Sequence, residues 1–137
     1  MARVGEKATL ATNGHVQSPS SIEWPSIYSG IDIIINQETP SHQDGSSAPS
    51  LLDLVVSLGS HDALFHISDL GAEFAYLPGT LIFLAGKLLK HGVPEWNKGE
   101  RIALAHYMKD DVHNRFNVAR PAFTEQKDIL RHFVQYN

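Results

Sequence analysis

Short apolar runs separated by turn residues are the feature that most restricts the fold of this chain. The runs are Ile31–Asn36, Leu51–Leu58, Ala63–Ile67, Gly71–Tyr76, Thr80–Ala85, Leu88–Val93 and Arg101–Met108. Turn signals that recur every 8–12 residues or so are typical of an all-β sandwich or barrel. No mid-chain segment carries a long 3.6-residue period, which argues against helices that alternate with strands. The first half of Leu51–Leu58 is also compatible with a helical turn.

The segments outside this train divide the chain into an arm and a domain. Residues 1–22 predict an irregular N-terminal arm, with room for a short strand over Ala8–Thr12, and residues 23–137 predict one domain. The Pro- and Ser-rich stretch 37–50 predicts a loop. In Thr124–Tyr136, Thr124 is a good N-cap and apolar residues recur at helical spacing, so a short C-terminal helix is expected there.

Composition excludes several classes of protein. Hydrophobic residues are 42% of 137, enough for one packed core, and the net charge of −4 gives no broad basic footprint for nucleic acid. No apolar stretch approaches the ~18 residues of a membrane span. Cys is absent and there are 8 His, so a metal would need His, carboxylate or backbone oxygen ligands. We expect a nuclear or otherwise intracellular protein.

The sharpest chemical pattern is His42-Gln43-Asp44 followed much later by His91. Two imidazoles and one carboxylate are the donor set of the facial triad in non-haem Fe(II) oxygenases, which leaves coordination positions open for a 2-oxo acid and O₂. Residues i and i+2 of a strand share a face, so His42 and Asp44 can point together. The order of the three residues suits a double-stranded β-helix, a jelly-roll or cupin-like fold that is mainly β. They are the candidate catalytic residues and metal ligands.

Arg101 follows His91 by ten residues. In 2-oxoglutarate oxygenases of this architecture, a basic residue at about this distance binds the far carboxylate of the cosubstrate, and the planar guanidinium suits a carboxylate. Asn36, at the end of a predicted strand, either contacts the cosubstrate or base or caps the loop. Taken singly, each of these residues also reads as a turn, loop or surface residue. Their order and spacing together favour the oxygenase site.

The stretch from Ser29 to about Val118 resembles the compact fungal members of the TET/JBP family of dioxygenases (ten-eleven translocation and J-binding protein). The matching segments are I-N-x-x-T-P-x-H-x-D-G (Ile35–Gly45), L-G (Leu58-Gly59), P-G-T (Pro78–Thr80), H-G-V (His91–Val93) and R-I-A-L-A-H-Y-M-K-D-D-V-H (Arg101–His113). The resemblance implies a double-stranded β-helix that uses Fe(II), 2-oxoglutarate and O₂. It implies oxidation of the methyl group of 5-methylcytosine or thymine in DNA, so DNA with a methylated base is the expected partner.

The residues that recognise the base in this family are matched less completely in this sequence. Its 5-methylcytosine enzymes often have Asn or Asp where this chain has Ser47, and a base-contacting His where it has Lys109, with His106 nearby. Tyr107 matches an aromatic residue that can stack on a flipped base. Only about 30 residues precede the first strand, fewer than in family catalytic domains. A fragment, a degenerate copy and a minimal enzyme are therefore all compatible with the sequence.

Two rival functions remain open at the level of sequence. A 2-oxoglutarate oxygenase that acts on a protein or small molecule fits the net charge better, because phosphate contacts dominate the affinity of proteins for DNA. The second rival is a catalytically inactive, cupin-like binding domain. Metal binding and the salt dependence of DNA binding distinguish the three.

Overall fold

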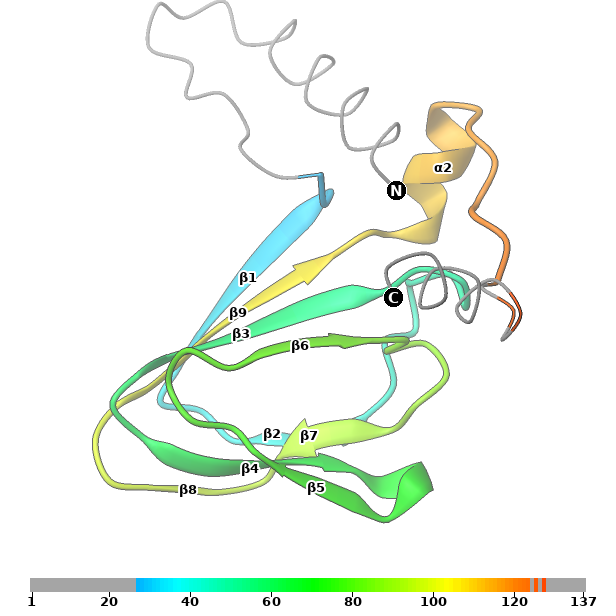
Figure 1. Ribbon diagram of the computed structural model, residues 1–137. Coiled ribbons are helices and arrows are strands. Elements are labelled where there is room, and N and C mark those ends of the chain that lie inside the picture. Colours follow the sequence, from blue (N-terminus) through cyan, green and yellow to red (C-terminus); the bar gives the residue numbers. More distant parts are fainter. Residues whose placement is uncertain (1–26, 124, 126, 128–137) are drawn as a thin grey trace, which may run out of the picture.

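The computed structural model describes residues 27–123, 125 and 127, in which two antiparallel sheets face each other (Figure 1). The first sheet has the strand order β1 (Gly30–Ile35), β9 (Arg101–Tyr107), β3 (Asp53–Gly59) and β6 (Leu81–Leu84). The second has the order β2 (Thr39–His42), β7 (His91–Val93), β4 (Asp62–Ile67) and β5 (Ala72–Ala75), and β8 (Trp96–Asn97) pairs with β4. This mainly β arrangement is the one expected of a double-stranded β-helix.

Strand β9 organises the first sheet. It pairs with β1 on one side and β3 on the other, and neither register contains a shift. Since neighbouring side chains on a strand point to opposite faces, Arg101, Ala103, Ala105 and Tyr107 lie on one face. Arg101 contacts Thr39 of β2 from that face, so it is the face turned toward the second sheet.

Apolar side chains fill the space between the sheets and one end of the molecule. The core between the sheets consists of Ala63, Phe65, Ile67, Tyr76, Leu84 and Val93. A second cluster, made of Tyr28, Ala48, Leu51 and Met108, packs against Val112 of the short helix α2 (Asp110–Arg115). Helix α2 follows β9 directly, so the second cluster closes the end of the first sheet.

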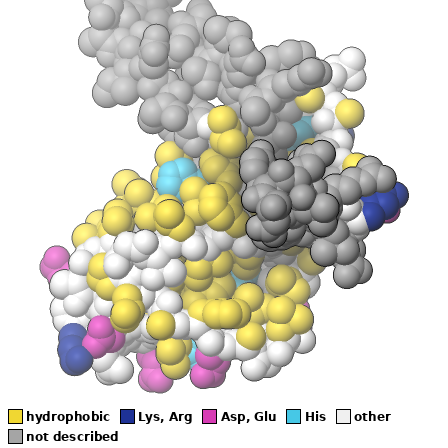
Figure 2. Space-filling model, viewed as in Figure 1, with side chains coloured by type: hydrophobic (Ala, Val, Ile, Leu, Met, Phe, Trp, Pro, Cys, Tyr) yellow, Lys and Arg dark blue, Asp and Glu magenta, His cyan; other side chains and the backbone are white. Residues whose placement is uncertain are grey.

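The outer face of the first sheet is apolar as well. Ile33 of β1 is 65% exposed, and Leu81 and Phe83 of β6 are 59% and 61% exposed. Figure 2 shows hydrophobic side chains over much of the visible surface. Among the described residues, no helix is long and apolar enough to cross a membrane.

The prediction of a loop over residues 37–50 is wrong in its first part, because Thr39–His42 forms strand β2. Pro40 made the segment read as a loop, since proline cannot donate a hydrogen bond to a neighbouring strand. Strand β2 lies at the edge of the second sheet, where proline is tolerated. Its register with β7 also shifts between Thr39 and His42, so the strand pairs at its two ends.

The 3₁₀ turn η1 spans Ser68–Leu70, and two further elements, β8 and α2, were not expected from the sequence. Each is too short to carry a hydrophobic period. The predicted arm 1–22, its short strand Ala8–Thr12 and nearly all of the predicted helix Thr124–Tyr136 lie outside the described residues. The division of the chain at residue 22 therefore stays a prediction.

The attachment of β2 at the edge of the second sheet is expected to depend on Gly92 of β7. A Cβ atom at Gly92 would lie 2.6 Å from the Thr39 carbonyl oxygen and 3.0 Å from backbone atoms of Pro40 and Ser41, so any side chain would push β2 away. Gly92→Ala should lower the free energy of unfolding by roughly 1–3 kcal/mol, as other overpacked sites do. Denaturant unfolding measures the change.

Gly45→Ala is the matched control, because a Cβ atom at Gly45 meets nothing within 4 Å. Equal stability of the Gly92→Ala variant and this control would show that β2 does not need the close approach.

Candidate metal centre

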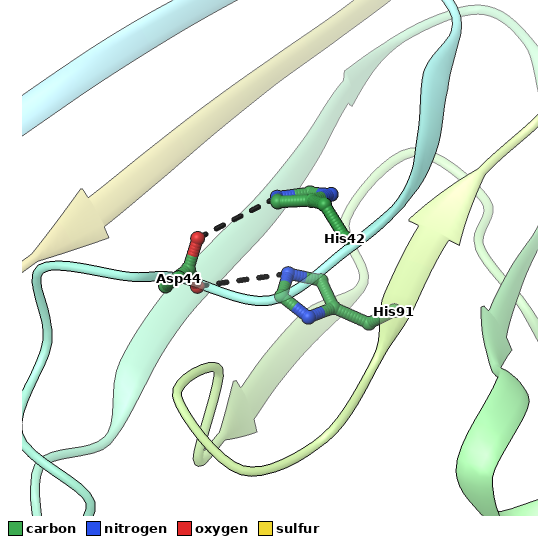
Figure 3. Close-up of side chains that lie close together, drawn as sticks. All are labelled: His42, Asp44 and His91. Carbon is green, nitrogen blue, oxygen red and sulfur yellow. Dashed lines mark ion pairs between the residues drawn. The ribbon is translucent and has the colours of Figure 1, made fainter.

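The pairing of β2 with β7 brings two imidazoles together. His42, the last residue of β2, stands opposite His91, the first residue of β7. Their ring centroids are 4.5 Å apart. Asp44 follows in the loop, and its amide donates to the Gly86 carbonyl oxygen at 2.9 Å, which fixes the loop over the two rings. Figure 3 shows the carboxylate of Asp44 facing both imidazoles.

Backbone carbonyl groups set the orientation of both rings. Nδ1 of His42 lies 2.9 Å from the Pro40 oxygen, and Nδ1 of His91 lies 3.0 Å from the Leu89 oxygen. A carbonyl oxygen only accepts, so Nδ1 carries a proton in each ring, and in the neutral form of the ring Nε2 keeps a free lone pair. This tautomer, held by an outer hydrogen bond, is the one that metal-binding histidines use.

The free Nε2 atoms point at the Asp44 carboxylate. Nε2 of His42 is 3.5 Å from Oδ1, and Nε2 of His91 is 3.7 Å from Oδ2. Burial is the main cause that lowers the pKa of His91, so this ring is neutral at neutral pH. Lone pairs that face a carboxylate repel it unless a cation lies between them. The donor atoms lie within 4.8 Å of one another, so the set fits a divalent cation with nitrogen and oxygen ligands.

A glycine makes room for the carboxylate. A Cβ atom at Gly86 would lie 2.0 Å from Oδ2 of Asp44 and 2.7 Å from Oδ2 of Asp53. Any other residue at position 86 would displace one or both carboxylates. Gly86 is therefore part of the site, although nothing in the sequence marked it.

Asp53 is a second carboxyl group at the site that the sequence analysis missed. It lies on β3, is buried, and has its pKa raised to about 7 by burial first and then by the charge and hydrogen bond of Asp44. Ser47, predicted to contact substrate, places its hydroxyl 3.3 Å from both Asp53 oxygens. Asp53 is the one charged residue in an otherwise apolar run, but nothing in the sequence places it beside Asp44.

The three predicted ligands line one part of a cavity of about 360 Å³, and Arg101 lines another. That volume suits a small-molecule site. Other residues that line the cavity include Thr39, Val55, Phe65 and Val93. Among the predicted substrate residues, Tyr107, Lys109, Ser47 and His106 border the same cavity.

Arg101 is a buried cation whose contacts in the protein are all neutral. It is 1% exposed, donates from Nη1 to the Gln37 oxygen, and donates from Nη2 to Oγ1 of Thr39 at 3.1 Å. Its Nε has no partner, and no acidic side chain of the described chain forms an ion pair with it. Burial lowers the pKa of Arg101. A buried guanidinium in this state fits an incoming carboxylate.

Asn36 acts on the main chain of Arg101. The side-chain oxygen Oδ1 of Asn36 accepts a hydrogen bond from the main-chain amide of Arg101 at 2.9 Å, and the main-chain amide of Asn36 donates to the carbonyl oxygen of Arg101 at 2.8 Å. Asn36 thereby fixes the start of β9. A direct contact of Asn36 with a cofactor stays a prediction.

Tyr107 and its neighbours form one border of the cavity. The Tyr107 hydroxyl donates to Oδ1 of Asp32 at 3.2 Å, and Nζ of Lys109 lies 5.7 Å from the ring centroid. Gly30 leaves room for the ring, because a Cβ atom there would lie 2.4 Å from it. The ring of His106 lies 5.7 Å from the ring of Tyr28, in the second apolar cluster.

Comparison with known protein families decides what this site belongs to. The family model Tet_JBP, described as the oxygenase domain of the 2OGFeDO superfamily, matches residues 9–110. The chain belongs to the Tet_JBP family. The match includes both sheets and every predicted ligand, and membership of this superfamily implies Fe(II) and 2-oxoglutarate as cofactors.

Similarity to a solved structure supports the fold of this Tet_JBP domain. The structure, NgTET1 in complex with 5mC DNA, matches with a TM-score of 0.55 and 15% sequence identity. The match covers 94% of this chain and 50% of that chain, so the Tet_JBP domain described here spans about half the length of its structural relative. A search of the curated proteins finds no significant match.

We expect each of the variants His42→Ala, Asp44→Ala and His91→Ala to abolish tight binding of Mn(II), a redox-stable substitute for Fe(II), because each removes one of three ligands. Isothermal titration calorimetry on the metal-free protein measures the affinity. His66→Ala is the control, since that imidazole lies on β4 beside Glu73. Wild-type affinity in two of the three variants would refute the ligand assignment.

The raised pKa of Asp53 predicts a dependence of stability on pH in the metal-free protein. The folded state holds the Asp53 proton more tightly than the unfolded chain, so this stability is present at about pH 4 and is lost as the pH rises toward 7. Asp53→Asn cannot ionise. We therefore expect the variant to unfold at a higher temperature than wild type at pH 8 and at a similar temperature at pH 5.

Thermal unfolding in the presence of a chelator at both pH values makes the comparison. If wild type and Asp53→Asn differ in unfolding temperature by the same amount at both pH values, Asp53 is already ionised in the folded protein.

Proposed function

We propose that this chain is an Fe(II)- and 2-oxoglutarate-dependent oxygenase that oxidises the methyl group of 5-methylcytosine or thymine in DNA. The observation that carries the oxygenase assignment is the pairing of two groups in one cavity. The donor set of His42, Asp44 and His91 lines one part of it, and the uncompensated cation of Arg101 lines another. A metal and a dicarboxylic cosubstrate would satisfy both groups.

The residues of the chain have distinct tasks in this reaction. His42, Asp44 and His91 would hold Fe(II), and Arg101 would bind the far carboxylate of 2-oxoglutarate. When bound, Fe(II) and 2-oxoglutarate would supply the chemistry by which O₂ oxidises a methyl group to a hydroxymethyl group, with 2-oxoglutarate converted to succinate and CO₂. Phe65 stacks on His91 at 5.7 Å between ring centroids, and Val55 and Val93 also line the cavity, so part of its wall is apolar.

Three observations support a DNA base as the substrate. The ring of Tyr107 borders the cavity and has Ala105 on its strand face, which leaves space for a flat base. Lys109 lies beside this ring and can contact a phosphate. The structural relative was solved with 5mC DNA.

A second candidate function is oxidation of a substrate other than nucleic acid. The net charge of −4 and the carboxylate of Asp32 beside Tyr107 favour it, because both repel phosphate. The oxygenase chemistry is the same in the two candidates.

One assay tests both candidates. The protein is incubated with Fe(II), 2-oxoglutarate and O₂, together with duplex DNA that contains 5-methylcytosine or only unmodified cytosine. Mass spectrometry then measures succinate and the nucleosides released by digestion. Hydroxymethylated base that requires both the methylated duplex and Asp44 supports the proposal. Succinate without oxidised base would retain the oxygenase and reject 5-methylcytosine and thymine in duplex DNA, whereas neither product would reject the activity.

Tyr107 provides the matched variants for the DNA proposal. Tyr107→Ala should weaken binding of the methylated duplex by roughly 5- to 150-fold, because stacking of a base on an aromatic ring contributes about 1–3 kcal/mol. Tyr107→Phe keeps the ring and loses only the bond to Asp32, so its affinity should stay near wild type. Fluorescence anisotropy measures both, and circular dichroism checks folding. Unchanged affinity in Tyr107→Ala would exclude base stacking on this ring.

A further inference from the structure

The outward side of the first sheet presents two apolar side chains from each of its four strands. Arg101 and Ala103 of β9 point toward the second sheet, so the alternate residues of β9 and their cross-strand partners point away from it. We call this surface the outer apolar face. It consists of Ile33 and Ile35 of β1, Ile102 and Leu104 of β9, Val56 and Leu58 of β3, and Leu81 and Phe83 of β6. Figure 2 shows hydrophobic side chains over β1, at one edge of this sheet.

The outer apolar face has no cover among residues 27–123. Ile33, Ile35 and Phe83 are 65%, 54% and 61% exposed. Antiparallel sheets commonly turn polar side chains toward water, and a large contiguous apolar patch marks a contact surface. The helix α2 packs on the second apolar cluster instead. A cover for this face therefore has to come from outside this part of the chain.

The C-terminal segment carries an apolar stripe that suits such a face. Its apolar residues Ile129, Leu130, Phe133 and Tyr136 have the spacing i, i+1, i+4 and i+7, which puts them on one side of a helix. Arg131 and His132 fall on the opposite side. The backbone of Lys127, the last residue that the structure describes, is already helical. A helix this short is marginal in water unless its apolar side packs against something.

The chain also enters this segment close to the outer apolar face. Val118 and Leu54 of β3 both pack against the second apolar cluster, and Leu54 pairs with Phe83 of that face. Nε of Arg120 donates to Oδ1 of Asp110 at 2.7 Å, which holds the chain there. The seven residues that follow Arg120 can span up to roughly 23 Å. Three strand spacings amount to about 14 Å, so the segment can reach every strand of the sheet.

We propose that residues 128–137 dock as an amphipathic helix on the outer apolar face and form a third layer behind the first sheet. Arg101 and Val55 line the cavity from the inner side of the same sheet, so the docked helix would support that wall from behind. Residues 1–26 fit the face less well, because their apolar residues show no helical period. This inference is independent of the proposed function.

A single introduced thiol can report on the face, because the chain has no Cys. Val56→Cys places the thiol on the face, and Phe74→Cys places a control thiol on β5 of the second sheet. Each is made in the full-length protein with and without the pair of changes Ile129→Asp and Phe133→Asp, whose charges oppose docking on an apolar surface. The rate of reaction with a maleimide is measured under native conditions.

We expect the thiol of Val56→Cys to react at least about tenfold faster when the apolar stripe carries the two charges, because the docked helix must otherwise open first. The thiol of Phe74→Cys should react at the same rate in both backgrounds. Arg131→Asp with His132→Asp is the matched control, since it adds two acidic residues on the polar side of the helix and should leave both rates unchanged.

Hydrogen exchange gives a second readout that needs no variant. In the full-length protein, the amides of residues 128–136 should exchange at least about tenfold more slowly than those of an isolated peptide of residues 124–137. If both thiols react faster in the charged background, that variant has unfolded and the exchange measurement decides.

Two results would overturn the proposal. The first is an unchanged rate for Val56→Cys in the charged background, or amide exchange as fast as in the peptide. The second is a rate for Val56→Cys that falls as the protein concentration rises, together with a dimer in sedimentation velocity. That second result would assign the outer apolar face to a second copy of the chain.

Discussion

The pairing of β2 with β7 is the interaction on which the candidate site depends. At one end of β2, His42 stands opposite His91. At the other end, Oγ1 of Thr39 accepts a hydrogen bond from Arg101. A strand of four residues thus reaches from the candidate metal ligands to the buried cation, and it ties the second sheet to β9 of the first. Gly92 permits this arrangement because it lets the two backbones approach closely.

The charges of the cavity are unbalanced along its length. Asp44 and Asp53 place two carboxyl groups side by side against Gly86, and the pKa of Asp53 is raised first by burial and then by the neighbouring Asp44. Arg101 places a buried positive charge elsewhere in the cavity without an acidic partner among the described residues. A divalent cation would relieve the first imbalance and a carboxylate the second. The protein therefore carries electrostatic strain that its two ligands would remove together, as preorganised sites do.

The sequence predicted the elements whose residues repeat an apolar pattern. The predicted runs Ile31–Asn36 and Arg101–Met108 correspond closely to β1 and β9. A short apolar run that is β-branched or alternates in polarity is typical of a strand with at least one buried face. The pattern His42, Asp44 and His91 was also visible, since ligand chemistry restricts residue type. Strand β2 escaped prediction because its stability comes from pairing with β7 and from Arg101, and not from its own composition.

The rest of the site depends on contacts between segments distant in sequence. Asp53 is a lone carboxyl group in an apolar run, and only the folded structure sets it beside Asp44. Tyr76 ended a predicted strand like any core aromatic, and in the structure its fully buried ring packs against Phe65. Gly86 matters only because two carboxylates converge on it. Such long-range coincidences leave no local signal in a single sequence.

The position of β2 at a sheet edge also has a kinetic consequence. The strand has one neighbour, an irregular register and mostly exposed side chains, so opening it costs less free energy than unfolding the domain. Because β2 carries His42 and contacts Arg101, its opening would uncover both ends of the cavity at once. Exchange of the metal and cosubstrate with solvent would then be governed by the local stability of four residues, and a protein that has bound both ligands would protect the β2 amides from hydrogen exchange.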